Sequence, residues 1–149
     1  MTEVLSPLAG RAVPLSAVPD PVFASELVGS GVAVEPPDTD APVTVVAPVA
    51  GVIAKLHPHA AVIVTDSGAG VLVHVGIDTV HCPEVFTLRA AEGDTVAAGD
   101  PLVVFAPNAV RRANRSPIVP VVVMDTPPGS ATAPAAGPVA PGDRLFTSS

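Results

Sequence analysis

The feature that most restricts the fold of this chain is the density of residues that interrupt regular structure. Nineteen prolines and twelve glycines are spread over 149 residues. Because proline lacks the backbone N–H that helix interiors and sheet ladders need, long regular elements do not fit between so many interruptions. The stretches between them are short runs rich in valine, a β-branched residue that favours strands. The pattern predicts an all-β fold built from many short strands.

Two short helical segments are expected among these strands. Residues 24–28 are predicted to form a single helical turn that ends at the following glycines, after a proline-rich loop over residues 18–23. Residues 106–115 carry Pro107 early and three arginines late, which is typical of a short helix.

The second half of the chain contains an internal echo. Residues 96–102 and 139–145 both match V-A-x-G-D-x-L, a turn leading into a strand, which fits a sandwich or barrel of two similar halves. Pro120 interrupts the apolar run 118–124 and suggests an edge strand or a break there. Residues 126–141 are Pro, Ala, Gly, Ser and Thr with almost nothing to bury, so they are predicted to be a flexible excursion.

Length and charge limit the classes of function. A chain of 149 residues is expected to form one domain, residues 1–149, with a real core. The net charge of −7 argues against a nucleic-acid partner and favours a basic protein partner. With no apolar run near 18 residues, no signal peptide and a single cysteine, Cys82, we expect a cytoplasmic protein.

The most informative stretch is a predicted hairpin that carries two histidines. The apolar runs 60–64 and 71–75 flank residues 65–68, whose Asp, Ser and Gly content is typical of a tight turn. If the loop has an even number of residues, His59 lies directly opposite His74, and the two imidazoles share one face. A loop with an odd number would send them to opposite faces. We predict the side-by-side arrangement.

Segments through nearly the whole chain carry a family resemblance. The matching segments, in order, are Ser6–Gly10, Val18–Ala24, Val45–Gly51, Leu56–Ala60, Asp66–Gly68, Val73–Val80, Glu92–Val96 and Ser116–Val122. The most specific is V-H-x-G-I-D-T, with a histidine fifteen residues earlier. Together they resemble the glucose-type enzyme IIA domain of the bacterial phosphoenolpyruvate-dependent sugar phosphotransferase system. The resemblance implies a flattened antiparallel β-barrel, or barrel-sandwich hybrid, with short helical turns.

The resemblance also implies a set of functional residues. His74 would carry a phosphoryl group, taken from the small carrier HPr and passed to a cysteine on the IIB domain of a sugar permease. His59 would stabilise that group. Asp20 and Asp78 would help to receive basic HPr, and we assign Val22 and Phe23 to the same partner-binding surface. No cofactor is implied, contact with the membrane would occur only through the permease, and the sugar itself would bind the permease.

Elementary chemistry is consistent with this assignment. A neutral imidazole nitrogen can attack phosphorus while the other nitrogen is held, and its pKa lies near neutrality. Phosphoryl transfer then depends mainly on positioning and on stabilising charge. A second imidazole at His59 can donate a hydrogen bond to the phosphoryl oxygens. The backbone N–H groups of Gly76 and Ile77 are expected to do the same.

The same residues also permit other interpretations. His57 shares parity with His59, and with His74 and Asp78 it invites a zinc site. The order of H-x-H and H-x-x-x-D is reversed relative to a zinc-peptidase family of related architecture, so metal is not required, although His59 and His74 could bind zinc adventitiously. Cys82 is interpreted as an incidental thiol.

Two further classes of protein share single features with this chain. Lys55 raises the alternative of a biotinyl or lipoyl carrier. Such a carrier needs an exposed lysine at a tight turn, whereas Lys55 lies in a strand pattern. The stretch 81–86 departs from the family pattern, which leaves open a degenerate domain that only docks onto a transporter or enzyme and regulates it.

Overall fold

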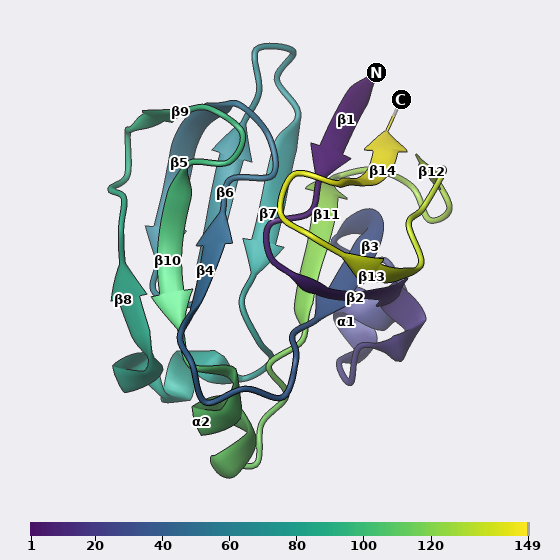
Figure 1. The fold of residues 1–149 in the computed structure, drawn as a ribbon. Helices are drawn as coiled ribbons and strands as arrows, with labels where there is room; N and C mark the ends of the chain where they lie inside the picture. The colour runs from purple at the N-terminus through teal and green to yellow at the C-terminus, as the bar shows by residue number, and fades with distance from the viewer. Residues whose placement is uncertain (149) are drawn as a thin grey trace.

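The computed structural model describes residues 1–148 as short strands connected by tight turns (Figure 1). The strands are β1 (Thr2–Leu5), β2 (Gly10–Pro14), β3 (Gly29–Glu35), β4 (Val43–Val46), β5 (Gly51–His57), β6 (Ala60–Val64), β7 (Gly70–His74), β8 (Phe86–Leu88), β9 (Thr95–Val96), β10 (Pro101–Phe105), β11 (Val119–Met124), β12 (Ala131–Thr132), β13 (Gly137–Val139) and β14 (Arg144–Ser148). The helices are α1 (Pro21–Ala24) and α2 (Pro107–Arg112), with 3₁₀ turns at Leu15–Ala17, Thr79–His81 and Pro83–Val85. Within these residues no helix is long and apolar enough to cross a membrane.

The strands form one long sheet and two short ones. The long sheet has eight strands in the order β13-β2-β3-β11-β7-β6-β5-β9, and the short ones have the orders β1-β14-β12 and β4-β10-β8. Every strand pair is antiparallel. The prediction of an all-β antiparallel fold is confirmed.

The strand order shows that the fold is built from two similar halves. In the long sheet each strand of one half has an equivalent in the other: β13 matches β9, β2 matches β5, β3 matches β6, and β11 matches β7. Counted from its own edge to the centre of the sheet, each half therefore has the same strand order. The short sheets then match each other, with β1 equivalent to β4 and β14 to β10. The loops after β1 and β4 cross: the N–H of Leu5 donates to the Pro48 carbonyl at 3.0 Å, and the N–H of Val46 donates to the Pro7 carbonyl at 2.8 Å.

The repeated V-A-x-G-D-x-L segments form equivalent turns in the two halves. In residues 96–102 and 139–145, the side chain of Asp100 or Asp143 accepts the N–H of the residue three positions before it, at 2.9 and 2.8 Å. The glycine before each aspartate has φ of +97° or +90°, a conformation that favours glycine. Residues 91–94 form a third turn of this kind, in which the Asp94 side chain accepts the N–H of Ala91 at 3.0 Å; the Glu-Gly-Asp run at 92–94 predicts this turn.

The buried apolar side chains form a main core and a second, smaller cluster. The main core lies between the sheets and consists largely of valine side chains contributed by both halves. The smaller cluster lies beneath α1 and the loop after β7, and packs Leu15, Val18, Phe23, Ala33, Ile77, Ile118 and Val122.

Both helices lie close to where the sequence suggested, but the first is displaced. Helix α1 spans Pro21–Ala24 and not residues 24–28. Asp20 caps it, accepting the N–H of Val22 at 2.8 Å, and Pro21 occupies its first turn. Proline at the first helical position lacks only an N–H that has no intrahelical partner, so the proline-rich stretch starts a helix where a loop was expected. Helix α2 lies within the predicted residues 106–115.

Two further expectations need correction. Pro120 does not lie on an edge strand, because β11 pairs with β3 on one side and β7 on the other. The ladder to β7 begins only at Val121, so no ladder N–H is required of Pro120 on that side. The segment 126–141, expected to be a flexible excursion, contributes β12, which pairs with β14, and β13, which pairs with β2.

The close approach of β3 to β11 yields a prediction about stability. A methyl group on Gly31 would collide with the carbonyl oxygen of Val121, whereas one on Gly70, in the same sheet, would have no neighbour closer than 3.9 Å. We expect Gly31→Ala to lower the free energy of unfolding by about 1–3 kcal/mol, as overpacking does. Gly70→Ala should leave it unchanged or slightly higher. Urea unfolding of both variants checks this, and equal stabilities would contradict it.

Candidate functional site

The candidate site is a small depression next to the end of β7. Its volume is about 130 Å³, and its lining combines two imidazoles, two carboxylates and apolar side chains. The lining residues are Asp20, Phe23, His59, His74, Ile77, Asp78, Thr79 and Val80. Depressions of about 330 and 520 Å³ lie elsewhere on the molecule, but neither is lined by a histidine.

The structure brings His59 and His74 together, although not through the predicted register. Their ring centroids are 5.3 Å apart, with the planes inclined by 73°. His74 pairs with Ala60 and not with His59, because five residues, 65–69, separate β6 from β7. The odd loop does not send the rings to opposite faces because His59 lies in the turn before β6, where strand alternation no longer applies. The Val75 N–H donates to the His59 carbonyl at 2.6 Å and fixes that turn against β7.

His74 is held in one tautomer by its own loop. Its Nδ1 lies 2.6 Å from the carbonyl oxygen of Gly76. Since a carbonyl can only accept, Nδ1 carries the proton, and the lone pair of the neutral ring is on Nε2. The ring also packs against Phe23, at a centroid distance of 5.2 Å.

The loop that orients His74 is anchored to the irregular segment that directly precedes β11. The N–H of Gly76 donates to the Ile118 carbonyl at 3.0 Å, and the N–H of Ile77 donates to the Ser116 carbonyl at 2.9 Å. These two N–H groups are therefore already bonded within the protein, which corrects the expectation that they contact the phosphoryl group. Gly76 contributes its carbonyl oxygen, and its φ of +83° favours glycine.

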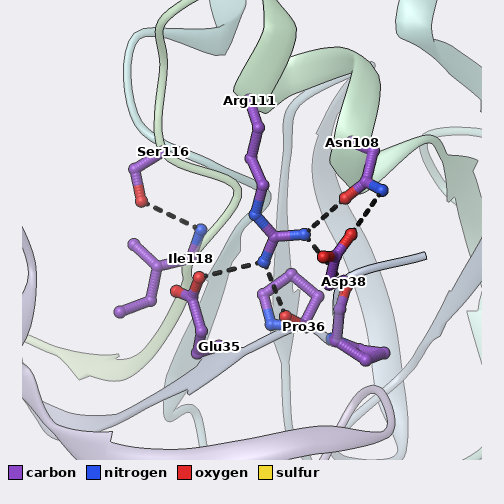
Figure 2. Close-up of polar contacts among 8 residues, drawn as sticks. Glu35, Pro36, Asp38, Asn108, Arg111, Ser116 and Ile118 are labelled. Atoms are coloured by element: carbon purple, nitrogen blue, oxygen red, sulfur yellow. Dashed lines mark hydrogen bonds and ion pairs between the residues drawn. The ribbon is translucent and has the colours of Figure 1, made fainter. Parts of the chain in front are cut away.

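Helix α2 fixes the start of this anchoring segment. Figure 2 shows Arg111 reaching from α2 to the end of β3 and the chain that follows it. Its guanidinium donates to the Pro36 carbonyl at 2.7 Å and forms an ion pair with Glu35 at 3.1 Å. The α2–β11 connection is thus tied to β3, and through it the His74 loop is tied to the sheet.

The acidic and apolar residues predicted to bind a partner separate into two groups. Asp20 and Asp78 line the depression, and Val22 is 44% exposed beside it. Phe23 is only 8% exposed and packs against His74, so it supports the imidazole and is not an exposed partner contact as expected. Val80, 55% exposed and on the lining, was missed.

Thr79 is a second residue that sequence reasoning missed. It is fully buried, and its hydroxyl donates to the Val75 carbonyl at 2.7 Å, which closes the loop after β7. Its place as the last residue of V-H-x-G-I-D-T was the available signal. The remaining candidates lie outside the depression: Cys82 is buried, and burial raises the pKa of its thiol, while Lys55 is exposed on β5. Among residues 1–148 no group of three or more His, Cys, Asp or Glu side chains is placed to hold a metal ion.

Comparison with known proteins decides the family. Residues 2–128 match the model of the phosphoenolpyruvate-dependent sugar phosphotransferase system family EIIA 1. The chain belongs to this family. It is 43% identical over 123 residues to a "PTS system glucose-specific EIIA component" of Halalkalibacterium halodurans, covering 80% of this chain and 69% of that protein. The fold matches "glucose permease IIA" from Mycoplasma capricolum with a TM-score of 0.85 and 30% identity, covering 97% and 94% of the two chains.

Other relatives carry the same domain within longer proteins. The chain is 42% identical over 126 residues to the "PTS system glucose-specific EIIBCA component" of Corynebacterium glutamicum. The match covers 83% of this chain and 18% of that protein, so the chain spans less than a fifth of that relative's length. The resemblance to glucose-type enzyme IIA, noted from the sequence, is confirmed.

In this EIIA family member, burial keeps both site histidines neutral. Burial lowers the pKa of His59, and the charges of His74 and His57 lower it further. Burial also lowers the pKa of His74, against the opposing effects of the Gly76 hydrogen bond, Asp20 and Asp78. The lowered pKa values favour the neutral form of both imidazoles at neutral pH.

The lowered pKa values predict how stability depends on pH. Above about pH 7, His59 and His74 are neutral in both the folded and the unfolded chain. Below about pH 7 the unfolded chain, in which histidine has a pKa near 6.5, binds protons that the folded chain does not. Stability should therefore fall between about pH 7 and pH 5. Denaturant unfolding at several pH values should give a shallower fall for His74→Gln than for the wild type, and equal slopes would refute the lowered pKa of His74.

The carboxylate at Asp20 offers a separate test of the electrostatics. Asparagine can still cap α1, but it removes a negative charge that raises the pKa of His74. We expect Asp20→Asn to lower the pKa of His74 further, as measured by NMR titration of the imidazole. Asp66→Asn, at the far end of the β6–β7 hairpin, is the matched control and should leave that pKa in place. A rise after Asp20→Asn would show that the carboxylate does not act through its charge.

Proposed function

We propose that this chain is a phosphohistidine carrier in which Nε2 of His74 accepts a phosphoryl group from phospho-HPr and passes it to the cysteine of a sugar-permease IIB domain. The observation that carries the proposal is the bond between His74 Nδ1 and the Gly76 carbonyl at 2.6 Å, which leaves Nε2 as the nucleophile. Family membership supplies the context of a sugar phosphotransferase component.

The transfer is a pair of displacements at phosphorus. In the first, the lone pair of Nε2 forms the N–P bond as the bond from phosphorus to the donor breaks. In the second, the thiolate of the IIB cysteine forms an S–P bond as the N–P bond breaks, and the electron pair returns to Nε2. The fixed Nδ1–H···O bond to Gly76 stabilises the positive charge that develops on the ring while phosphorus is attached.

His59 is proposed to stabilise the phosphoryl oxygens. Its ring is placed 5.3 Å from that of His74, and it is less deeply buried than its neighbour. A dianionic group on His74 would favour the charged form of His59 and so raise its pKa, turning it into a charge-assisted hydrogen-bond donor.

The surface around the depression fits a basic protein partner. Asp20 and Asp78 supply negative charge, exposed Val22 and Val80 supply apolar contact, and the whole chain has a net charge of −7. Opposite charges speed association with HPr. The names of the longer relatives combine B, C and A components, which supports a IIB domain as recipient and a glucose-type permease as its context. The proposal places the chain in the cytoplasm.

The test is incubation with phosphoenolpyruvate, enzyme I and HPr, followed by mass measurement of the intact protein. The wild type should gain one phosphoryl group and His74→Ala none. His59→Ala should still accept the group but pass it to a IIB domain roughly a hundredfold more slowly, the cost typical of losing one donor to a developing charge.

His81→Ala is the matched control, because His81 is an exposed histidine outside the depression. This variant should be phosphorylated on His74 as fully as the wild type. An unlabelled wild type, or full labelling of His74→Ala, would overturn the carrier role and favour a domain that only docks and regulates. Full transfer by His59→Ala would remove the supporting role of that ring.

A further inference from the structure

His57 lies beside the site but has no part in the transfer proposed above. It is the last residue of β5, exposed, and its ring is stacked on that of His59. The centroids are 5.7 Å apart and the planes are inclined by only 20°, an offset stack of the kind that aromatic pairs prefer. His59 is therefore contacted by two imidazoles, His57 from β5 and His74 from β7.

The backbone between the two stacked rings is unusually restricted. His57 pairs with Ala60, so Pro58 and His59 form a two-residue turn between β5 and β6. Proline fixes its own φ and restricts the preceding residue to extended conformations. The H-P-H sequence thus holds the bases of both side chains in place before the rings meet, and the stack forms with little loss of backbone entropy.

The side chain of His59 needs such support more than that of His74 does. His74 is oriented by a hydrogen bond to Gly76 and by packing on Phe23. Within residues 1–148 the ring of His59 forms no hydrogen bond, and it is only partly buried. Its orientation rests on the two neighbouring imidazoles.

We propose that His57 is a positioning residue of the phosphoryl site, whose stacked ring holds His59 in the orientation that faces the phosphoryl group on His74. This inference rests on the proposed function and extends it to a third imidazole. The carboxylates of Asp20 and Asp78 act on His74, and not directly on this pair.

The experiment compares two substitutions that separate stacking from the ring nitrogens. His57→Ala removes the ring, and His57→Phe keeps a flat ring without nitrogens. Lys55→Ala, at an exposed position on the same strand, is the control. Loading of His74 from phospho-HPr should be unchanged in all three. Delivery to the IIB domain should fall about threefold to tenfold in His57→Ala, in kcat and not in KM, and stay near wild type in His57→Phe and Lys55→Ala.

A second measurement on the unphosphorylated protein keeps the test independent of transfer. NMR shifts of the His59 ring protons should move in His57→Ala, because the ring current of His57 is lost. Wild-type delivery by His57→Ala, unmoved His59 shifts, or a His57→Phe variant as slow as His57→Ala would each overturn the positioning role by stacking. If the wild type accepts no phosphoryl group, the proposed function and the role of His57 in transfer both fail. The NMR shifts of His59 do not depend on phosphorylation, so they still show whether His57 stacks on His59.

Discussion

The pairing of β7 with β11 is the interaction on which the rest of the structure depends. These strands lie at the centre of the eight-stranded sheet, and three residue pairs, from Val121–Val73 to Val123–Val71, join the two similar halves. All six side chains in this ladder are valine or leucine, and most are fully buried. The same pairing sets the end of β7, and therefore the position of His74 relative to the segment before β11.

The two halves have the same backbone arrangement but different side chains at the equivalent positions. Met124 ends β11 and pairs with Gly29, as His74 ends β7 and pairs with Ala60. The residue after each makes the same bond: Val75 donates to the His59 carbonyl, and Asp125 donates to the Val28 carbonyl. The pseudo-symmetry thus places Val28 and Met124 where the other half has His59 and His74. The scaffold is common to both ends of the sheet, and only one end carries imidazoles.

The sequence predicted the fold class, most strands and the two site histidines, because these depend on local signals. Valine runs bounded by Gly and Pro define strands, and the repeated V-A-x-G-D-x-L turns revealed the two halves. The hairpin register was wrong, because loop length depends on how residues 65–69 close, which composition does not determine. The rings of His59 and His74 meet because His59 lies in a turn, a fact that strand periodicity cannot express.

The errors at the site arise from tertiary contacts that a single segment does not contain. Gly76 and Ile77 were expected to offer free N–H groups, but Ser116 and Ile118, some forty residues later in the chain, accept them. Phe23 was expected on the surface, but capping of α1 by Asp20 starts the helix early and turns the ring onto His74. In the first case a distant segment determined what the local motif could do; in the second, a local cap moved the start of the helix.

The same tertiary contacts set the balance that the proposed carrier role of His74 needs. Burial alone would keep His74 neutral but leave a phosphorylated ring without stabilisation, because a buried positive charge is costly. The Gly76 carbonyl and Asp78, both in the loop after β7, and Asp20, the N-cap of α1, oppose the effect of burial on the pKa of His74. The proposed transfer needs a ring that is neutral beforehand and tolerated as a cation during the reaction, and so requires both influences at once. The fold supplies burial through the small apolar cluster beneath the loop and supplies the opposing acceptors at its rim.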